Sequence, residues 1–222
     1  MNKQNEKNTK IKICGIKNSN ILKFLIDNSV DYFGLIFYEK SPRYINIDEA
    51  SDLTKIAKDT KTKAVGVFVD FPINIIQKYI DNLNLKFIQL HGNESENYIN
   101  KIKNNNDIKI IKKIGIKNNE DALITKEFTL ADYILFDYKP IYNDELPGGN
   151  AKKFNWEIVK NLNIKQKWFL SGGINVENIQ NALDLNNLYG LDISSGVEDM
   201  PGVKSIEKIS KILKIINIRN EY

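Results

Sequence analysis

Short apolar runs recur along the whole chain, and segments with a helical repeat of apolar positions separate them. Each run is rich in β-branched or aromatic residues, which is typical of buried strands. The eight predicted strands span residues 10–14, 32–37, 64–69, 87–90, 108–114, 133–136, 168–171 and 190–194. Helical spacing is clearest in residues 21–26, 48–58, 73–80, 177–183 and 205–216.

The regular alternation of strand and helix predicts the fold class. Eight units of about 27 residues indicate an α/β protein with a closed (β/α)8 TIM barrel, because an open doubly wound sheet would rarely need eight strands without an added domain. We expect a single barrel domain over residues 1–222, in which residues 1–9 are a polar N-terminal extension.

Composition and charge limit the kinds of ligand that such a domain is expected to bind. The 222 residues, of which 42% are hydrophobic, are ample for one core. A net charge of +4 from 32 basic and 28 acidic side chains is too balanced for nucleic-acid binding, although it would mildly favour an anionic small molecule. We therefore expect a small-molecule partner and no nucleic acid. We also expect a monomer, with a homodimer as the alternative.

The N-terminal residues and the single cysteine indicate the cellular location. The first ten residues are polar and lack the apolar core of a signal peptide, and no apolar run approaches the roughly 20 residues that span a bilayer. One cysteine excludes an internal disulfide and a multi-thiolate metal site, which fits a reducing compartment. We expect a cytoplasmic protein without membrane contact.

Polar residues at or just beyond the strand ends are the candidates for function, because the chemistry of a (β/α)8 barrel lies at the C-terminal ends of its strands. These candidates are Cys14, Arg43, His91, Asp137 and Asp192. Each has a structural alternative. Cys14 alone would more often be a small buried hydrophobe. Asp137 could cap a loop, and Asp192 could support the turn that follows it. His91 could be a hydrogen-bonded rim residue, and Arg43 could be a solvated loop charge.

Two glycine- and serine-rich turns predict a phosphate site. They follow the seventh and eighth predicted strands, so that their backbone N–H groups and hydroxyls would converge on one anion. The predicted phosphate-binding residues are Gly172, Gly173, Ser194, Ser195 and Gly196. Ordinary turn chemistry is the alternative interpretation. A phosphate ester is the expected substrate.

The motifs at the strand ends, taken in order, resemble those of the phosphoribosylanthranilate isomerases of tryptophan biosynthesis. The resemblance covers nearly the whole chain, although any one motif would be weak evidence. The matching segments are KICGI (12–16), GLIFYEKSPRYI (34–45), VGVFVD (65–70), IQLHGNE (88–94), LFDYK (135–139), PGGNAKKFNW (147–156), LSGGINVENI (170–179) and DISSGVEDMPGVKS (192–205).

The resemblance implies an Amadori rearrangement that needs no metal or organic cofactor. N-(5-phosphoribosyl)anthranilate would become 1-(2-carboxyphenylamino)-1-deoxyribulose 5-phosphate by general acid and base catalysis. By the pattern of the family, Cys14 is the base at C2 and Asp137 is the acid at the ring oxygen, while Arg43 lies near the anthranilate carboxylate. His91 and Asp192 would contact the substrate at most.

The residue types at these positions suit the two roles. Partial burial behind four apolar residues should favour the protonated form of Asp137. Cys14 must work as a thiolate, which needs positive surroundings. Lys12 is a cation on the same side of the strand as Cys14, because side chains alternate along a strand. Strands one and six are three steps apart in a barrel of eight, which leaves room for a sugar ring between the two side chains and no direct contact.

Three other functions stay open from the residues alone. An indole-glycerol-phosphate synthase would want catalytic lysines and a glutamate, the related isomerase of histidine biosynthesis would want an aspartate in place of Cys14, and a non-catalytic phosphate-binding barrel would lack the acid–base pair. The loop after strand six also departs from the GGTGK or GGSGK of the family, since residues 148–152 read GGNAK and residues 138–146 lengthen it. We expect this difference to affect turnover more than activity itself.

Overall fold

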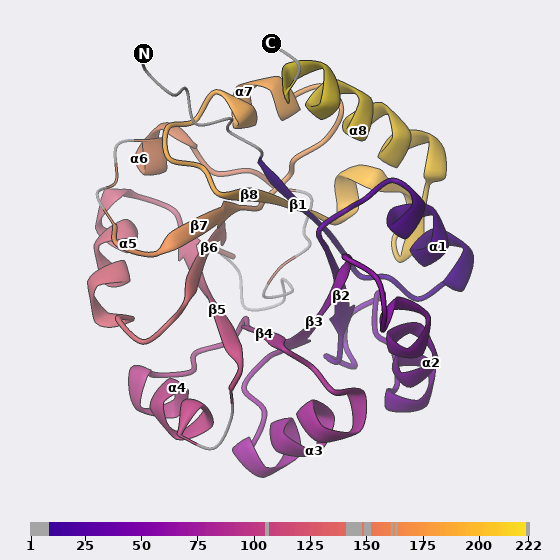
Figure 1. Cartoon of the computed structure of the whole chain (residues 1–222). Coiled ribbons are helices and arrows are strands. Elements are labelled where there is room, and N and C mark those ends of the chain that lie inside the picture. The colour runs from indigo at the N-terminus through magenta and orange to yellow at the C-terminus, as the bar shows by residue number, and fades with distance from the viewer. Residues whose placement is uncertain are drawn as a thin grey trace, which may run out of the picture.

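The computed structural model describes residues 9–104, 107–140, 148, 152–160, 162 and 164–220. Eight parallel strands pair in chain order and close into a barrel, because β8 pairs with β1 as well as with β7 (Figure 1). The strands are β1 Lys10–Cys14, β2 Tyr32–Ile36, β3 Lys63–Phe68, β4 Phe87–Leu90, β5 Lys109–Ile116, β6 Tyr133–Tyr138, β7 Lys167–Leu170 and β8 Gly190–Ile193. The predicted (β/α)8 barrel is confirmed, and each predicted strand overlaps an observed one.

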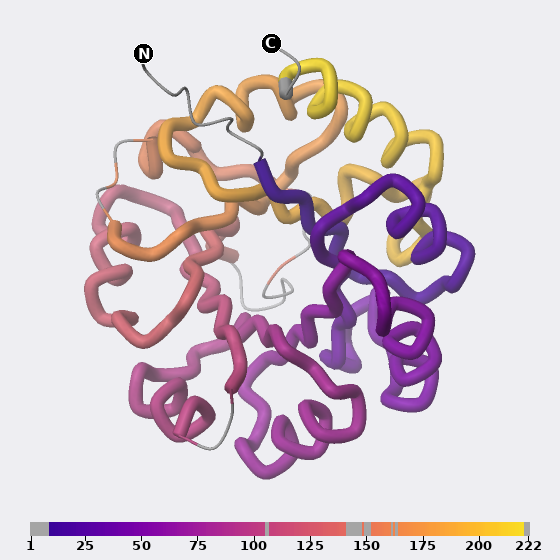
Figure 2. Tube along the Cα trace, viewed as in Figure 1, coloured from indigo at the N-terminus to yellow at the C-terminus, as the bar shows by residue number. Residues whose placement is uncertain are grey.

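The helices form an outer ring around the barrel, and the trace in Figure 2 runs once around it from the N-terminus to the C-terminus. They are α1 Ser19–Asp27, α2 Ile47–Ala57, α3 Ile73–Leu83, α4 Glu96–Lys103, α5 Asn119–Leu123, α6 Glu157–Lys160, α7 Ile179–Leu183 and α8 Ile206–Asn220, with a 3-10 turn η1 at Ile124–Glu127. Within the described residues, no helix is long and apolar enough to cross a membrane.

Local sequence signals start several of these helices. The side chain of Asn46 accepts a hydrogen bond from the N–H of Glu49, and the side chain of Glu49 accepts one from the N–H of Asn46. This capping box begins α2. The side chains of Asn18 and Ser95 accept hydrogen bonds from backbone N–H groups in the first turns of α1 and α4, with no reciprocal contact. Such caps fix where each helix leaves the loop at the mouth of the barrel.

Two apolar clusters fill the molecule and leave the barrel open at the C-terminal ends of its strands. One layer lies between the barrel and the helices. A smaller cluster fills the barrel itself, and its buried members are Tyr32, Val65, Ile111, Leu135 and Phe169. Because this cluster fills the barrel at the N-terminal ends of the strands, a ligand can enter only at their C-terminal ends.

A short segment after β8 was not predicted. Ser195–Val197 form a 3-10 turn, η2, and β9 Glu198–Met200 pairs antiparallel with β10 Val203–Lys204. The chain reverses at Gly202, whose φ of +85° is a conformation that favours glycine. This hairpin lies against the β2–α2 loop, since a Cβ on Gly202 would overlap the carbonyl oxygen of Pro42.

Candidate active site

A pocket opens at the C-terminal ends of the strands, as predicted. Among its lining residues are six of the residues singled out from the sequence: Cys14, Arg43, His91, Asp137, Asp192 and Ser194. They come from β1, β6 and β8 and from the segments that follow β2, β4 and β8. The structure therefore brings together side chains that lie up to 180 positions apart in the chain.

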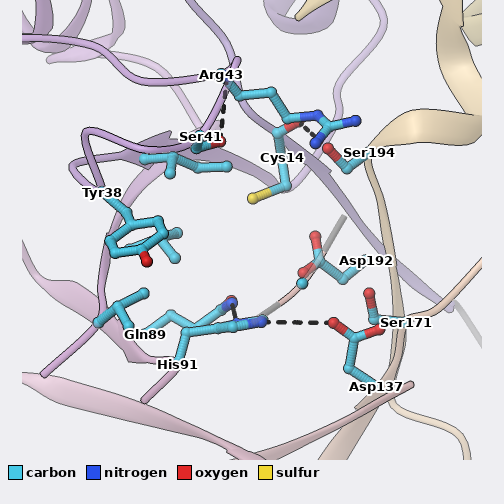
Figure 3. A pocket seen from close by; sticks show the side chains of 14 residues that line it. Cys14, Tyr38, Ser41, Arg43, Gln89, His91, Asp137, Ser171, Asp192 and Ser194 are labelled. Atoms are coloured by element: carbon cyan, nitrogen blue, oxygen red, sulfur yellow. Dashed lines mark hydrogen bonds and ion pairs between the residues drawn. The ribbon is translucent and has the colours of Figure 1, made fainter. Parts of the chain in front are cut away.

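The thiol of Cys14 and the carboxyl of Asp137 point into this pocket from opposite sides (Figure 3). No hydrogen bond joins them among the described residues, in line with the expectation of a gap between strands one and six. An apolar wall lies on the β2–β3 side, and its members are Ile36, Tyr38, Val67 and Val69. The space between the acid and the thiol thus has one polar end and one apolar end.

Cys14 is 5% exposed, and this burial raises the pKa of its thiol above the ordinary value of 9.0. The ammonium groups of Lys12 and Lys204 act in the opposite direction, although burial outweighs them. Lys12 is fully buried, and its ammonium donates to both carboxylate oxygens of Asp192 at 2.9 Å. The same ammonium acts to lower the pKa of Cys14, as a cation on that side of the strand should.

Asp137 contacts Tyr138, its neighbour on β6, and His91, which directly follows β4. Its Oδ1 accepts a hydrogen bond from the N–H of Tyr138 at 2.8 Å, and its Oδ2 lies 3.5 Å from Nε2 of His91. Nδ1 of His91 in turn lies 2.7 Å from Nε2 of Gln89. Sequence reasoning missed Gln89, although a polar residue two positions before His91 in an apolar strand must face the same side.

Arg43 lines the pocket, but its guanidinium is already engaged in an ion pair that the sequence did not predict. Its Nε donates to Oε1 of Glu198 at 2.8 Å, and its Nη2 donates to Oε2 at 2.7 Å. Lys204 also contacts Glu198, at 2.6 Å. The interpretation of Arg43 as a solvated loop charge is wrong, because the residue is 4% exposed.

Asp192 also differs from its expected structural role. The alternative to substrate contact was that it supports the turn after β8, whereas its two oxygens accept hydrogen bonds from Lys12 inside the barrel. The turn is tied down by Ser194 instead. The hydroxyl of Ser194 donates to the carbonyl of Cys14 at 3.0 Å and accepts a hydrogen bond from Lys204 at 3.2 Å.

The two predicted phosphate turns meet in one small cavity next to the main pocket. Gly172 and Gly173 adopt φ values of +88° and +70°, and no hydrogen bond within the described residues uses the N–H of Gly173 or Ser195. Gly196 does not line this cavity, because it packs against the carbonyl of Ile174. Lys152 does line it and was not predicted as a phosphate residue.

The loop that departs from the family pattern is described only in part. Residues 141–147 and 149–151 lie outside the described residues, as do residues 1–8 of the expected N-terminal extension. Gly148 lies against the acid, since a Cβ there would overlap Nε2 of His91 and come 3.1 Å from Oδ2 of Asp137. Within the described part of the chain, no group of three or more potential metal ligands is assembled.

Comparison with known proteins agrees with this geometry. Residues 11–215 match the family model of N-(5'-phosphoribosyl)anthranilate isomerase. An Agrobacterium fabrum protein with that name is 38% identical over 93% of this chain and 94% of its own length. The crystal structure of the Thermotoga maritima phosphoribosyl anthranilate isomerase superposes with a TM-score of 0.84 at 31% identity, covering 94% of this chain and 98% of the other.

A second crystal structure holds a ligand. It is a phosphoribosyl anthranilate isomerase in complex with reduced 1-(o-carboxyphenylamino)-1-deoxyribulose 5-phosphate, and it is 30% identical to this chain with a TM-score of 0.81 over 94% of this chain and 98% of the other. The family match covers most of the chain and all the strand ends that line the pocket. This chain belongs to the N-(5'-phosphoribosyl)anthranilate isomerase family.

Proposed function

We propose that this protein isomerises N-(5-phosphoribosyl)anthranilate to 1-(2-carboxyphenylamino)-1-deoxyribulose 5-phosphate, with Cys14 as the base and Asp137 as the acid. The observation that carries the proposal is the placement of a thiol and a carboxyl on opposite sides of one pocket (Figure 3). The relative that holds a reduced form of this product supports it.

The shape of the pocket supports one orientation of the substrate. The phosphate lies in the cavity formed by Gly172, Gly173 and Ser195. The N–H groups of Gly173 and Ser195 have no partner among the described residues and can bind its oxygens. The anthranilate ring then packs on the apolar wall of the β2–β3 side, next to Tyr38. The ribose lies between the two ends, within reach of Cys14 and Asp137.

The reaction follows from this orientation. Asp137 donates a proton to the ring oxygen, the C1–O bond breaks, and an iminium forms. Cys14 removes the proton from C2 to give an enolamine, which tautomerises to the ketone. Lys12 and Lys204 favour the thiolate against the effect of burial. The N–H of His91 can stabilise the carboxylate that Asp137 becomes.

Arg43 is the proposed partner of the anthranilate carboxylate. Glu198 fixes the plane of the guanidinium by its two hydrogen bonds, which would pre-organise Arg43 at the pocket wall. His91 and Asp192 line the same pocket and are proposed to contact the substrate there, and Ser194 and Gly196 are proposed to shape the phosphate turn.

The site is built from one chain, so we propose that a monomer is active, with a homodimer as the alternative. The phosphoribosylanthranilate isomerase of Thermotoga maritima is dimeric, and monomers of it have been generated. Analytical ultracentrifugation of this protein would decide its own oligomeric state. A base that must stay a free thiol favours a reducing compartment, and we propose a cytoplasmic location.

The test is a direct assay of the purified protein. The loss of phosphoribosylanthranilate is followed by its fluorescence, with a coupled enzyme that removes the product. We expect turnover without any added metal or cofactor. Absence of turnover in a folded preparation would refute the proposed function.

A further inference from the structure

We propose that Lys113 is a positioning residue whose ammonium group stabilises the carboxylate that Asp137 becomes when it gives its proton to the substrate. This inference deepens the proposed function and rests on it for the role of Asp137. Lys113 lies on β5 and is half-buried at the mouth of the barrel. The proposed reaction assigns it no step, although it is a cation on the inner face of the barrel next to the acid.

The side chain of Lys113 points into the barrel. Ile111, two positions earlier on β5, belongs to the apolar cluster that fills the barrel. Because side chains alternate along a strand, Lys113 faces the same side as Ile111, whereas Lys112 faces outward and donates to Glu94 at 2.8 Å. Lys113 also lines a cavity at the mouth that shares His91 with the substrate pocket.

The position of β5 in the barrel brings this side chain next to the acid. β5 lies between β4 and β6, so the contact of 3.5 Å between His91, which follows β4, and Asp137 on β6 spans it (Figure 3). Gly115 is the residue of β5 that pairs in register with Asp137. A Cβ on Gly115 would lie only 3.3 Å from Nζ of Lys113. The ammonium therefore lies at the level of Asp137 on the adjacent strand, and adjacent strands are about 4.8 Å apart.

The charges around Lys113 leave its ammonium available to Asp137. Burial lowers the pKa of Lys113 below the ordinary value of 10.5, and the carboxylate of Asp137 is the largest influence in the opposite direction. Lys112 and Lys139 act with burial, and Glu94 acts against it. Lys112 and Glu94 already pair with one another. Among the described residues, no hydrogen bond or ion pair engages the ammonium of Lys113.

The coupling between two charges is reciprocal, so an ammonium that the carboxylate favours must favour the carboxylate by the same free energy. Asp137 is 4% exposed, and negative charge is costly in such a place. As the proton moves to the ring oxygen of the substrate, this charge develops on Asp137. The ammonium of Lys113 stabilises the developing charge and hardly affects the neutral acid, so it lowers the barrier of the first step.

The coupling can be measured without substrate. NMR of the lysine side-chain nitrogens and their neighbouring carbons follows each ammonium as pH rises, and the signal missing from Lys113→Arg and Lys113→Met identifies Lys113. We expect it to titrate below 10.5 in the wild type, and at a lower pH still in Asp137→Asn, which removes the favourable carboxylate. Asp184→Asn removes an exposed carboxylate and should change nothing. An unchanged or raised midpoint in Asp137→Asn would overturn the inference.

Kinetics test whether this coupling serves the reaction. Lys113→Met keeps the length of the side chain and removes its charge. The ammonium accelerates the step only while Asp137 begins it protonated, because an ionised Asp137 is stabilised before the step as well. The rate constant of a single turnover with enzyme in excess should therefore be about tenfold lower in Lys113→Met at low pH, and the deficit should shrink as pH rises. Substrate affinity should change by less than about threefold.

Two further variants separate charge from shape. Lys113→Arg keeps the charge and should stay within about threefold of the wild-type rate constant. Lys109→Met removes an exposed lysine from the other end of β5 and should match the wild type at every pH. A deficit of Lys113→Met that is the same at every pH, or a Lys113→Arg as slow as Lys113→Met, would show a structural effect and overturn the positioning role.

Failure of this inference is distinguishable from failure of the proposed function. The titration of Lys113 decides the coupling even if the wild type does not isomerise phosphoribosylanthranilate. Absence of turnover in a folded wild type refutes the proposed function and leaves the measured coupling as it stands. If Lys113→Met does not fold, the titrations of the wild type and Asp137→Asn, with the signal assigned from Lys113→Arg, still give a decision.

Discussion

At the scale of single residues, the mouth of the barrel is a set of buried charges that neutralise one another. Lys12 pairs with Asp192, Arg43 with Glu198, and Lys112 with Glu94, and each of these side chains is 5% exposed or less. Breaking one partner of such a pair leaves an unpaired buried charge, which typically costs about 3–5 kcal/mol. Cys14 and Asp137, the proposed base and acid, lie among these paired charges.

The acid–base assignment predicts two inactive variants. Replacing Cys14→Ser or Asp137→Asn should lower kcat by about 100-fold or more and change KM little, because proton transfer stabilises the transition state only. Steady-state assays measure both constants. Asp184→Asn removes an exposed carboxylate that pairs with Arg219 at the rim of the molecule, and it serves as the control. Wild-type turnover in either site variant would refute the assignment.

The raised pKa of Cys14 predicts slow reaction with alkylating reagents. Because this is the only cysteine, the rate of modification by iodoacetamide reports it alone. Burial disfavours the thiolate, so the rate should increase with pH to a midpoint above 9.0 and stay low at neutral pH. A midpoint below 9.0 would show that Lys12 and Lys204 outweigh burial. A phosphorylated substrate analogue should slow the reaction further.

At the scale of the elements, the periodicity of apolar residues predicts most of the fold. It does not predict contacts between loops that are far apart in the sequence. The strands are found because each is a short apolar run. The helices α4, α5 and α6, of 8, 5 and 4 residues, were not singled out, whereas α7, of 5 residues, was found from the helical spacing of its apolar positions. The β9–β10 hairpin and its Glu198 could not be foreseen. Their partner Arg43 lies 155 positions earlier, and only the closure of β8 onto β1 brings the two loops together.

The same limit applies to the candidate site. Strand-end position predicted which residues would meet, because the barrel aligns all strand ends. The hydrogen-bond partners could not be predicted, since they depend on side-chain reach between neighbouring strands. The pairing of Asp192 with Lys12, and of Ser194 with the carbonyl of Cys14, are examples.

Glu198 of the β9–β10 hairpin holds Arg43 at the pocket, where we propose that Arg43 binds the anthranilate carboxylate. Arg43→Ala should lower kcat/KM roughly 10- to 150-fold, which corresponds to a charge-assisted hydrogen bond of about 1.5–3 kcal/mol to the anthranilate carboxylate. Inhibition by inorganic phosphate should be unchanged, while a product analogue with the carboxyphenyl group should bind more weakly. Lys40→Ala, an exposed cation in the same loop, is the control.

Equal losses for both inhibitors would contradict this role. They would mean that Arg43 supports the whole mouth through Glu198, because Glu198 is buried and would lose one of its two cations. The free energy of unfolding of Arg43→Ala, measured with urea, separates a folding defect from a loss of contact.

At the scale of the whole molecule, the closed barrel makes every strand depend on its two neighbours. β8 pairs with β1, so the two ends of the chain stabilise one another. The apolar layer between barrel and helices includes residues from β1 through α8. These features favour a single folding unit over residues 1–222, which remains a prediction.

A single unit predicts one unfolding transition. Trp168 on β7 is 2% exposed, and in a Trp156→Phe variant it is the only tryptophan. Its fluorescence should change at the same urea concentration as the far-ultraviolet circular dichroism, because all strands are lost together. Two separated midpoints would indicate that part of the barrel unfolds on its own.

The packing of Gly196 against the carbonyl of Ile174 limits which mutations the gene can accept at this codon. A Cβ at this position would overlap that oxygen, so even alanine requires the loops after β7 and β8 to move apart. Every amino acid that a single base change can make from a glycine codon carries a Cβ. The chain as a whole is rich in Asn, Lys and Ile, as expected of a gene that drifts toward adenine and thymine. At codon 196 such drift can proceed only through the silent third base, so this position should retain glycine however far the rest of the loop changes.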